Sequence, residues 1–193
     1  MRKASKKTFT FTLLLQGANP LESKNLAALY EAGCDDAVFG RRDAVFYADF
    51  DRKATSLAEA VGNAIRDVEG AVKGLRVVRV EPEELVSASA IAERIGRSRE
   101  SVRLLIDGKR GPGSFPPPAV WVSPKRRLWQ WSDAAEWFMT YLSEPPSTAE
   151  DASFIAAVNG ALNVRRHAAH LSRSRERKEV VRLITGDAQT LSA

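Results

Sequence analysis

The sequence predicts an α+β protein of three parts, residues 1–82, 86–142 and 147–185. Three observations lead to this prediction. Strand-like alternation and helix-like apolar stripes take turns along the first part, which indicates mixed secondary structure. The acidic segment 81–84, Glu-Pro-Glu-Glu, forms a connector to the second part. The stiff segment 143–147, Ser-Glu-Pro-Pro-Ser, precedes the third part, where apolar residues recur at helical spacing.

The predicted elements of the first part follow the order βαββαβ. Strands are expected at residues 8–16, 36–40, 44–50 and 75–81, with one helix between Asn19 and Gly33 and another from Thr55 or Ser56 to Gly70. This order is the split βαβ, or ferredoxin-like, plan. Sheets of this plan often pair with a copy of themselves or hold a small ligand, so we expect this part to mediate dimerisation or sensing.

Two short amphipathic helices are predicted within residues 90–107. Their apolar faces are formed by Ile91, Ala92 and Ile95, and by Val102, Leu105 and Ile106. Between the helices, Gly96 allows the positive φ of a helix end, and the Ser98 hydroxyl caps the helix that follows. Because the two apolar faces can close on each other, this spacing predicts a helix-turn-helix.

The second of these helices carries the polar side chains expected to read DNA. When such a helix lies in a major groove, long polar side chains reach base edges. The expected base-reading residues are Arg99, Glu100, Ser101 and Arg103. The residues expected to hold the phosphate backbone are Ser98, Lys109, Arg110, Lys125, Arg126 and Arg127.

A basic loop and a predicted hairpin follow the helices. The loop, residues 108–118, is rich in Gly and Pro and cannot continue a helix. Two short strands are then predicted at 119–123 and 127–131, around a cationic tip. A closing helix is expected to start at Asp133, with Glu136 as the reciprocal capping partner.

Three motifs of this part occur in one order along the chain. They are Gly113-Ser114-Phe115-Pro116-Pro117-Pro118, Arg127-Leu128-Trp129-Gln130-Trp131 and Trp137-Phe138. Here the chain resembles the small winged helix-turn-helix proteins of the MerR, excisionase and AlpA type. The resemblance covers about 55 of the 193 residues. It implies a DNA-binding module, and it also allows an excisionase-like architectural role or an antitoxin-type repressor.

The net charge of +5 lies almost entirely in this middle part. Residues 86–142 contain nine Lys or Arg against five Asp or Glu, whereas residues 1–85 contain thirteen of each kind. Cationic side chains that contact phosphates release counterions, so the binding of double-stranded DNA is expected to weaken steeply with salt.

The remaining composition argues against secretion, membrane insertion and catalysis. The single cysteine, Cys34, rules out an internal disulfide framework and suits a reducing cytoplasm. No run approaches the ~20 apolar residues of a bilayer span. The carboxylates that could hold Mg²⁺ are Asp35, Asp36, Asp43, Asp49 and Asp51. Several of them stand where Asp commonly serves turns, and no base marks Cys34 as a nucleophile, so we expect no enzyme, metal or cofactor.

Two functional classes remain open at this point. The first is a cytoplasmic, sequence-specific transcriptional regulator that binds double-stranded DNA as a homodimer, with an unknown effector. The second is a protein-interaction adaptor whose outer helices carry the function. The third part, 147–185, is expected to form an apolar helix or helix pair that dimerises or packs back on the first part.

Overall fold

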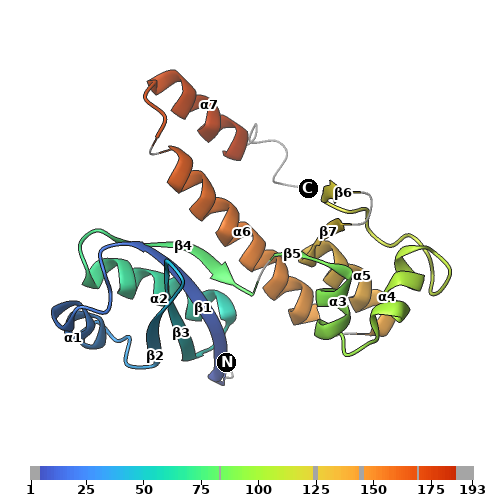
Figure 1. Ribbon diagram of the computed structural model, residues 1–193, viewed down its shortest axis with the longest axis horizontal. Helices are drawn as coiled ribbons and strands as arrows, with labels where there is room; N and C mark the ends of the chain where they lie inside the picture. Colours follow the sequence, from blue (N-terminus) through green and yellow to red (C-terminus); the bar gives the residue numbers. More distant parts are fainter. Residues whose placement is uncertain (1–4, 83, 124–125, 144–145, 169, 186–193) are drawn as a thin grey trace.

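A computed structural model describes residues 5–82, 84–123, 126–143, 146–168 and 170–185 (Figure 1). The protein is a mixed α+β molecule, which confirms the predicted class. Its apolar residues form two separate cores, one around a four-stranded sheet and the other within residues 86–142. We call the corresponding bodies the sheet lobe and the small lobe. They lie on either side of one long helix in Figure 1.

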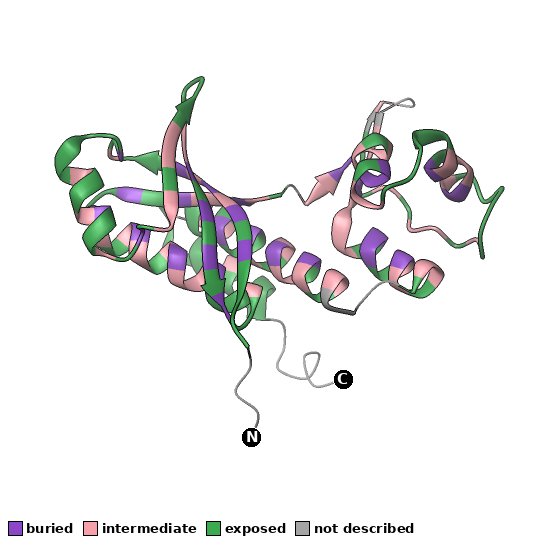
Figure 2. Cartoon of the chain, turned by 90° about the horizontal axis from the view of Figure 1, so that it is seen from below, coloured by how far each residue is buried: buried purple, intermediate pink, exposed green. Residues whose placement is uncertain are grey.

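The sheet lobe contains four strands and two helices. These are β1 (Lys7–Gly17), α1 (Ser23–Glu31), β2 (Ala37–Arg42), β3 (Val45–Ala54), α2 (Leu57–Ala71) and β4 (Leu75–Glu81). The strands form one antiparallel sheet in the order β2-β3-β1-β4. Alternate residues of β1, from Phe9 to Leu15, are buried, and Figure 2 shows the same alternation of purple and green along the strands. Leu29 of α1 and Val61 of α2 pack into this buried face.

The helix ends of the sheet lobe have local causes. Ser56 caps α2 by accepting the Glu59 N–H at 3.1 Å, while the Glu59 carboxylate accepts the Thr55 N–H at 2.8 Å. Helix α1 starts at Ser23, later than predicted, because the Asn19 side chain folds the preceding residues into a turn by accepting the Leu21 N–H. Gly33 ends it with a φ of +90°.

The small lobe is built from short elements. These are β5 (Leu85–Val86), α3 (Ala88–Arg94), α4 (Arg99–Ile106), β6 (Val120–Ser123), β7 (Arg126–Gln130) and α5 (Trp131–Leu142). The predicted hairpin corresponds to β6 and β7, and the two residues of β5 add an unpredicted third strand in the order β5-β7-β6. The predicted cap at Asp133 is wrong. Helix α5 begins two residues earlier, because the Trp131 N–H donates to the Glu84 carbonyl at 2.7 Å and joins the helix start to the connector.

The C-terminal part is a helix pair, α6 (Pro146–Ala168) and α7 (Ser174–Thr185). Helix α6 packs back on the sheet lobe, where Ile155 and Leu162 enter its core. Helix α7 buries none of its described residues and exposes Val181, Leu183 and Ile184. Within the described ranges, no helix combines the length and the apolar character needed to cross a bilayer.

The outer edge of β4 is covered by side chains. The Asn159 carboxamide of α6 accepts the Val80 N–H at 2.8 Å and donates to the Val80 carbonyl at 2.9 Å. Glu69 accepts the Val77 N–H at 2.8 Å, and Arg165 donates to the Val77 carbonyl at 2.7 Å. These contacts satisfy backbone groups that an exposed edge strand leaves unpaired.

Candidate nucleic-acid interface

Helices α3 and α4 are joined by a short turn with defined caps. Ser87 accepts the Ala90 N–H and so caps α3, and Ser98 accepts the Ser101 N–H at 3.2 Å and so caps α4. Gly96 in the turn has a φ of +62°, a conformation that favours glycine. The sequence predictions for Gly96 and Ser98 are therefore confirmed.

The apolar faces of the two helices close on each other over the rest of the small lobe. Ile91, Val102 and Leu105 are buried, whereas Ile95 and Ile106 are only partly buried at the margin of the same core. Because Val102 and Leu105 of α4 are buried in this core, the opposite side of the helix carries its polar residues outward.

Aromatic side chains hold the loop after α4 in place. Trp129 Nε1 donates to the Pro116 carbonyl at 3.1 Å, and Trp137 Nε1 donates to the Gly113 carbonyl at 3.0 Å. The Phe115 ring lies between these indoles, with ring centroids 6.3 Å from Trp129 and 5.1 Å from Trp137. The Gly-Ser-Phe-Pro motif therefore fixes the path of the loop, and with it the backbone that carries the two basic residues before it.

Most of the described contact residues lie on α4, at its cap and at the start of this loop, whereas Arg127 lies apart from them on β7. The exposed members are Ser98, Arg99, Glu100, Arg103, Lys109 and Arg110, and the half-buried ones are Ser101 and Arg127. Arg110 Nη1 donates to Ser101 Oγ at 3.5 Å, which joins the loop to the helix. Lys125 and the side chain of Arg126 lie outside the described residues.

Arg103 is paired with carboxylates of its own helix. Its guanidinium donates to Glu100 at 2.6 and 2.9 Å and to Asp107 at 3.1 Å. The hydrogen bond from Arg103 lowers the pKa of Glu100, so this carboxylate stays ionised at neutral pH. The pair is exposed to solvent, where such ion pairs are weak, so Arg103 can exchange these partners for a base edge or a phosphate.

Arg127 of β7 lies over two indole rings. Its guanidinium carbon is 5.8 Å from the Trp121 ring centroid and 5.3 Å from that of Trp129. Trp121 is 64% exposed, so Arg127 and Trp121 together form an outward surface on the hairpin. Trp121 pairs with Arg127 across β6 and β7, which puts the two side chains on the same face of the hairpin.

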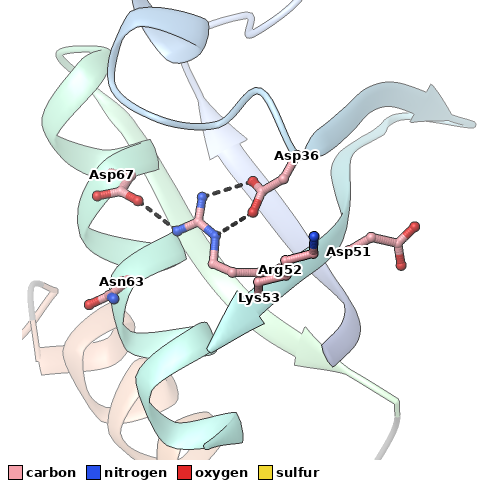
Figure 3. Close-up of a pocket in the computed structure, with 6 residues that line it drawn as sticks. All are labelled: Asp36, Asp51, Arg52, Lys53, Asn63 and Asp67. Atoms are coloured by element: carbon pink, nitrogen blue, oxygen red, sulfur yellow. Dashed lines mark hydrogen bonds and ion pairs between the residues drawn. The ribbon is translucent and has the colours of Figure 1, made fainter. Parts of the chain in front are cut away.

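The sheet lobe contains the competing candidate, a polar cluster around Arg52 (Figure 3). Arg52 is 6% exposed and donates to both Asp36 oxygens at 2.9 Å, to Asp67 at 2.6 Å and to the Gly33 carbonyl at 2.7 Å. These hydrogen bonds and the two carboxylate charges hold the Arg52 pKa above its ordinary value, against the opposing effect of burial. The cluster therefore ties three chain segments together and leaves its carboxylates engaged.

Two of the other carboxylates considered for metal binding, Asp49 and Asp51, are engaged as well. Asp51 accepts the Thr10 hydroxyl at 2.7 Å, and Asp49 accepts the Thr12 hydroxyl at 2.6 Å, across the open face of the sheet. Among the residues that the structure describes, no three His, Cys, Asp or Glu side chains lie together as metal ligands would.

Cys34 is expected to be unreactive in the folded protein. Burial raises the pKa of its thiol to about 11, and the Arg52 cation offsets only part of this rise. Since the thiolate is the reacting species, alkylation by iodoacetamide near pH 8 should be about 100-fold slower than in urea-unfolded protein. The thiol ionises first in the unfolded chain, so stability should also fall as the pH rises above about 9. Equal alkylation rates in the folded and unfolded protein would contradict the burial of Cys34.

Comparisons of this chain with protein-family models, with curated proteins and with solved structures find no match.

Proposed function

We propose that this protein is a sequence-specific DNA-binding transcriptional regulator that uses the small lobe as a winged helix-turn-helix. One observation carries the proposal. The polar side of α4 and the basic start of the following loop form one exposed surface, joined by the Arg110–Ser101 contact, over a buried core. In this proposal α3 and α4 are the helix pair, and β6 and β7 are the wing.

The dimensions of α4 suit a major groove. An α-helix with its side chains is about 10–12 Å across, which fits the ~12 Å width of the groove, and the eight residues of α4 run for about 12 Å within it. Recognition helices contact bases chiefly with their N-terminal residues, and Arg99 is the first residue of α4. A bidentate contact from Arg99 to guanine would contribute about 1–3 kcal/mol of discrimination.

Phosphate contacts are assigned to the residues beside α4. The capping Ser98 and the loop residues Lys109 and Arg110 adjoin α4 along the chain, and Arg127 stands on the wing. Cationic contacts of this kind hold the register on the duplex and make affinity dependent on salt. The strand order of the sheet lobe agrees with a ferredoxin-like plan, and we assign dimerisation or sensing to that lobe.

Binding to duplex DNA across a salt series tests the proposal. Anisotropy of a labelled random-sequence duplex should show affinity falling steeply between about 50 and 200 mM salt. Arg110→Ala and Arg127→Ala should each reduce the magnitude of the slope of log K against log salt by about 1. On a site selected from a random library, Arg99→Ala should weaken binding roughly 5- to 150-fold while the random duplex is affected much less.

Lys73→Ala is the matched control for these variants. It removes one exposed positive charge from the turn between α2 and β4, in the sheet lobe. The slope should then stay as in the unchanged protein. A flat salt dependence, or an equal effect of Lys73→Ala and Arg110→Ala, would refute the assignment of the small lobe to DNA.

Helix α7 favours the second candidate function, an adaptor that binds another protein. Val181, Leu183 and Ile184 are more than half exposed on this helix, and apolar side chains so arranged suit a partner surface. The same DNA assay separates the two functions, because an adaptor shows no salt slope that Arg110→Ala or Arg127→Ala reduces.

A further inference from the structure

A cavity of about 320 Å³ lies between the two lobes. Phe9 of β1 and Leu57 of α2 line it from the sheet lobe, Trp131 lines it from the start of α5, and Ile155 lines it from α6. Pro82 and Glu84 of the connector also line it, as do Thr10, Thr148 and Ala152. This volume is in the range of sites for small organic molecules, and aromatic and aliphatic side chains form much of the lining, as in such sites.

Two carboxylates are the charged groups of the cavity wall. Glu84 of the connector is one, and Asp151 of α6 is the other, whose pKa burial raises while the Lys7 ammonium partly opposes the rise. No described residue of the lining is a Lys, Arg or His. The charged side chains of the described lining are therefore negative.

The aromatic walls already lie beside cations of the chain itself. The Lys7 ammonium is 4.6 Å from the Phe9 ring centroid, and the Arg94 guanidinium carbon is 4.9 Å from the Trp131 ring centroid. Cations favour the faces of such rings because the π system is electron-rich. Aromatic rings and carboxylates in one apolar cavity are the groups that recognise an ammonium ion with a hydrophobic body.

We propose that this cavity is a binding site for a small organic cation, in which an apolar body packs between Phe9, Leu57 and Ile155 and an ammonium group contacts Glu84 and Asp151. The assignment concerns ligand binding alone and holds whether or not the small lobe binds DNA.

Calorimetric titration of the full chain with three ligands of one shape tests the site. The ligands are 2-phenylethylamine, which is protonated at neutral pH, the neutral 2-phenylethanol and the anionic phenylacetate. The amine should bind at least about tenfold more tightly than the alcohol, because only the amine carries the charge that the carboxylates require. Phenylacetate should give no measurable heat of binding.

Variants of unchanged shape test whether the ammonium group contacts Glu84 and Asp151. Glu84→Gln and Asp151→Asn should each weaken the amine at least about tenfold and leave the alcohol unchanged, because each removes one charge and retains the shape. Glu150→Gln is the matched control, since Glu150 is the exposed neighbour of Asp151 on α6 and does not line the cavity. Circular dichroism confirms that each variant is folded.

Three results would overturn the proposal. They are an amine that does not bind, an alcohol that binds as tightly as the amine, and an effect of Glu150→Gln as large as that of Asp151→Asn. Each of these results leaves the salt dependence of DNA binding unaffected, so the two proposals fail separately.

Discussion

Phe138→Ala is expected to lower the free energy of unfolding by about 3–5 kcal/mol, the usual loss when a large aromatic side chain is removed from a core. Phe138 is 1% exposed and lies against Phe115 and Trp137, with ring centroids 5.8 and 5.1 Å away. Urea titration followed by circular dichroism measures the change. If the small lobe binds DNA as proposed, the affinity should fall with it, because α4 rests on the same core.

Tyr30→Ala serves as the comparison for this variant. Tyr30 lies on α1 and is 67% exposed, so the substitution removes a similar aromatic ring without opening a cavity. Its effect on stability should stay within about 0.5 kcal/mol. A Phe138→Ala variant as stable as Tyr30→Ala would show that the core of the small lobe is packed differently.

Arg52→Met is expected to destabilise the sheet lobe by about 3 kcal/mol, near the lower end of the range for breaking a buried ion pair. The lower end applies because Asp36 and Asp67 are 29% and 32% exposed, so water solvates the two carboxylates in part. The loss arises because two carboxylates and the Gly33 carbonyl lose their donor together. Urea unfolding measures the change.

Two further variants test the cause of this loss. Lys53→Met changes the next residue of β3, which is exposed, and should alter stability by less than about 0.5 kcal/mol. Adding Asp36→Asn and Asp67→Asn to Arg52→Met should recover at least about half of the loss, because both uncompensated charges are then gone. No recovery would indicate that packing of the Arg52 stem over Phe50, rather than charge, is the main contribution.

Local signals predict those parts of the fold where one residue determines the backbone. Gly33 and Gly96 end helices with positive φ, and Ser56 and Ser98 accept the N–H three residues ahead. Strand alternation likewise predicts the faces of β1 and β3. These features depend on neighbours in sequence, so the sequence contains their cause.

Pairings between distant segments are not predictable in this way. Strand β5 has only two residues and exists because Leu85 and Val86 pair with Gln130 and Trp129. Beside this pairing, the hydrogen bond from the Trp131 N–H to the Glu84 carbonyl places the start of α5 at Trp131. The capping pattern at Asp133 is therefore misleading. The cavity between the two lobes also depends on pairings between distant segments, since its walls come from residues between β1 and α6.

The candidate nucleic-acid interface is predictable from the sequence in part. The side of α4 that carries Arg99 and Arg103 follows from helical spacing, and both side chains are exposed. The pairing of Arg103 with Glu100 could be predicted from their spacing of three residues. Arg52 also has a signal, because the alternation of β3 places it in register with the buried Phe50. DNA binding itself stays a prediction.

The carboxamide of Asn159 takes the place of one residue of a further strand, and so limits how the sheet can pair with copies of itself. With β4 closed in this way, the four-stranded sheet can be extended by another chain only along β2. Through the four-stranded sheet alone, one open edge per molecule permits at most a closed pair. Continuous filaments, which need two open sides, cannot grow from this sheet while α6 stays in place.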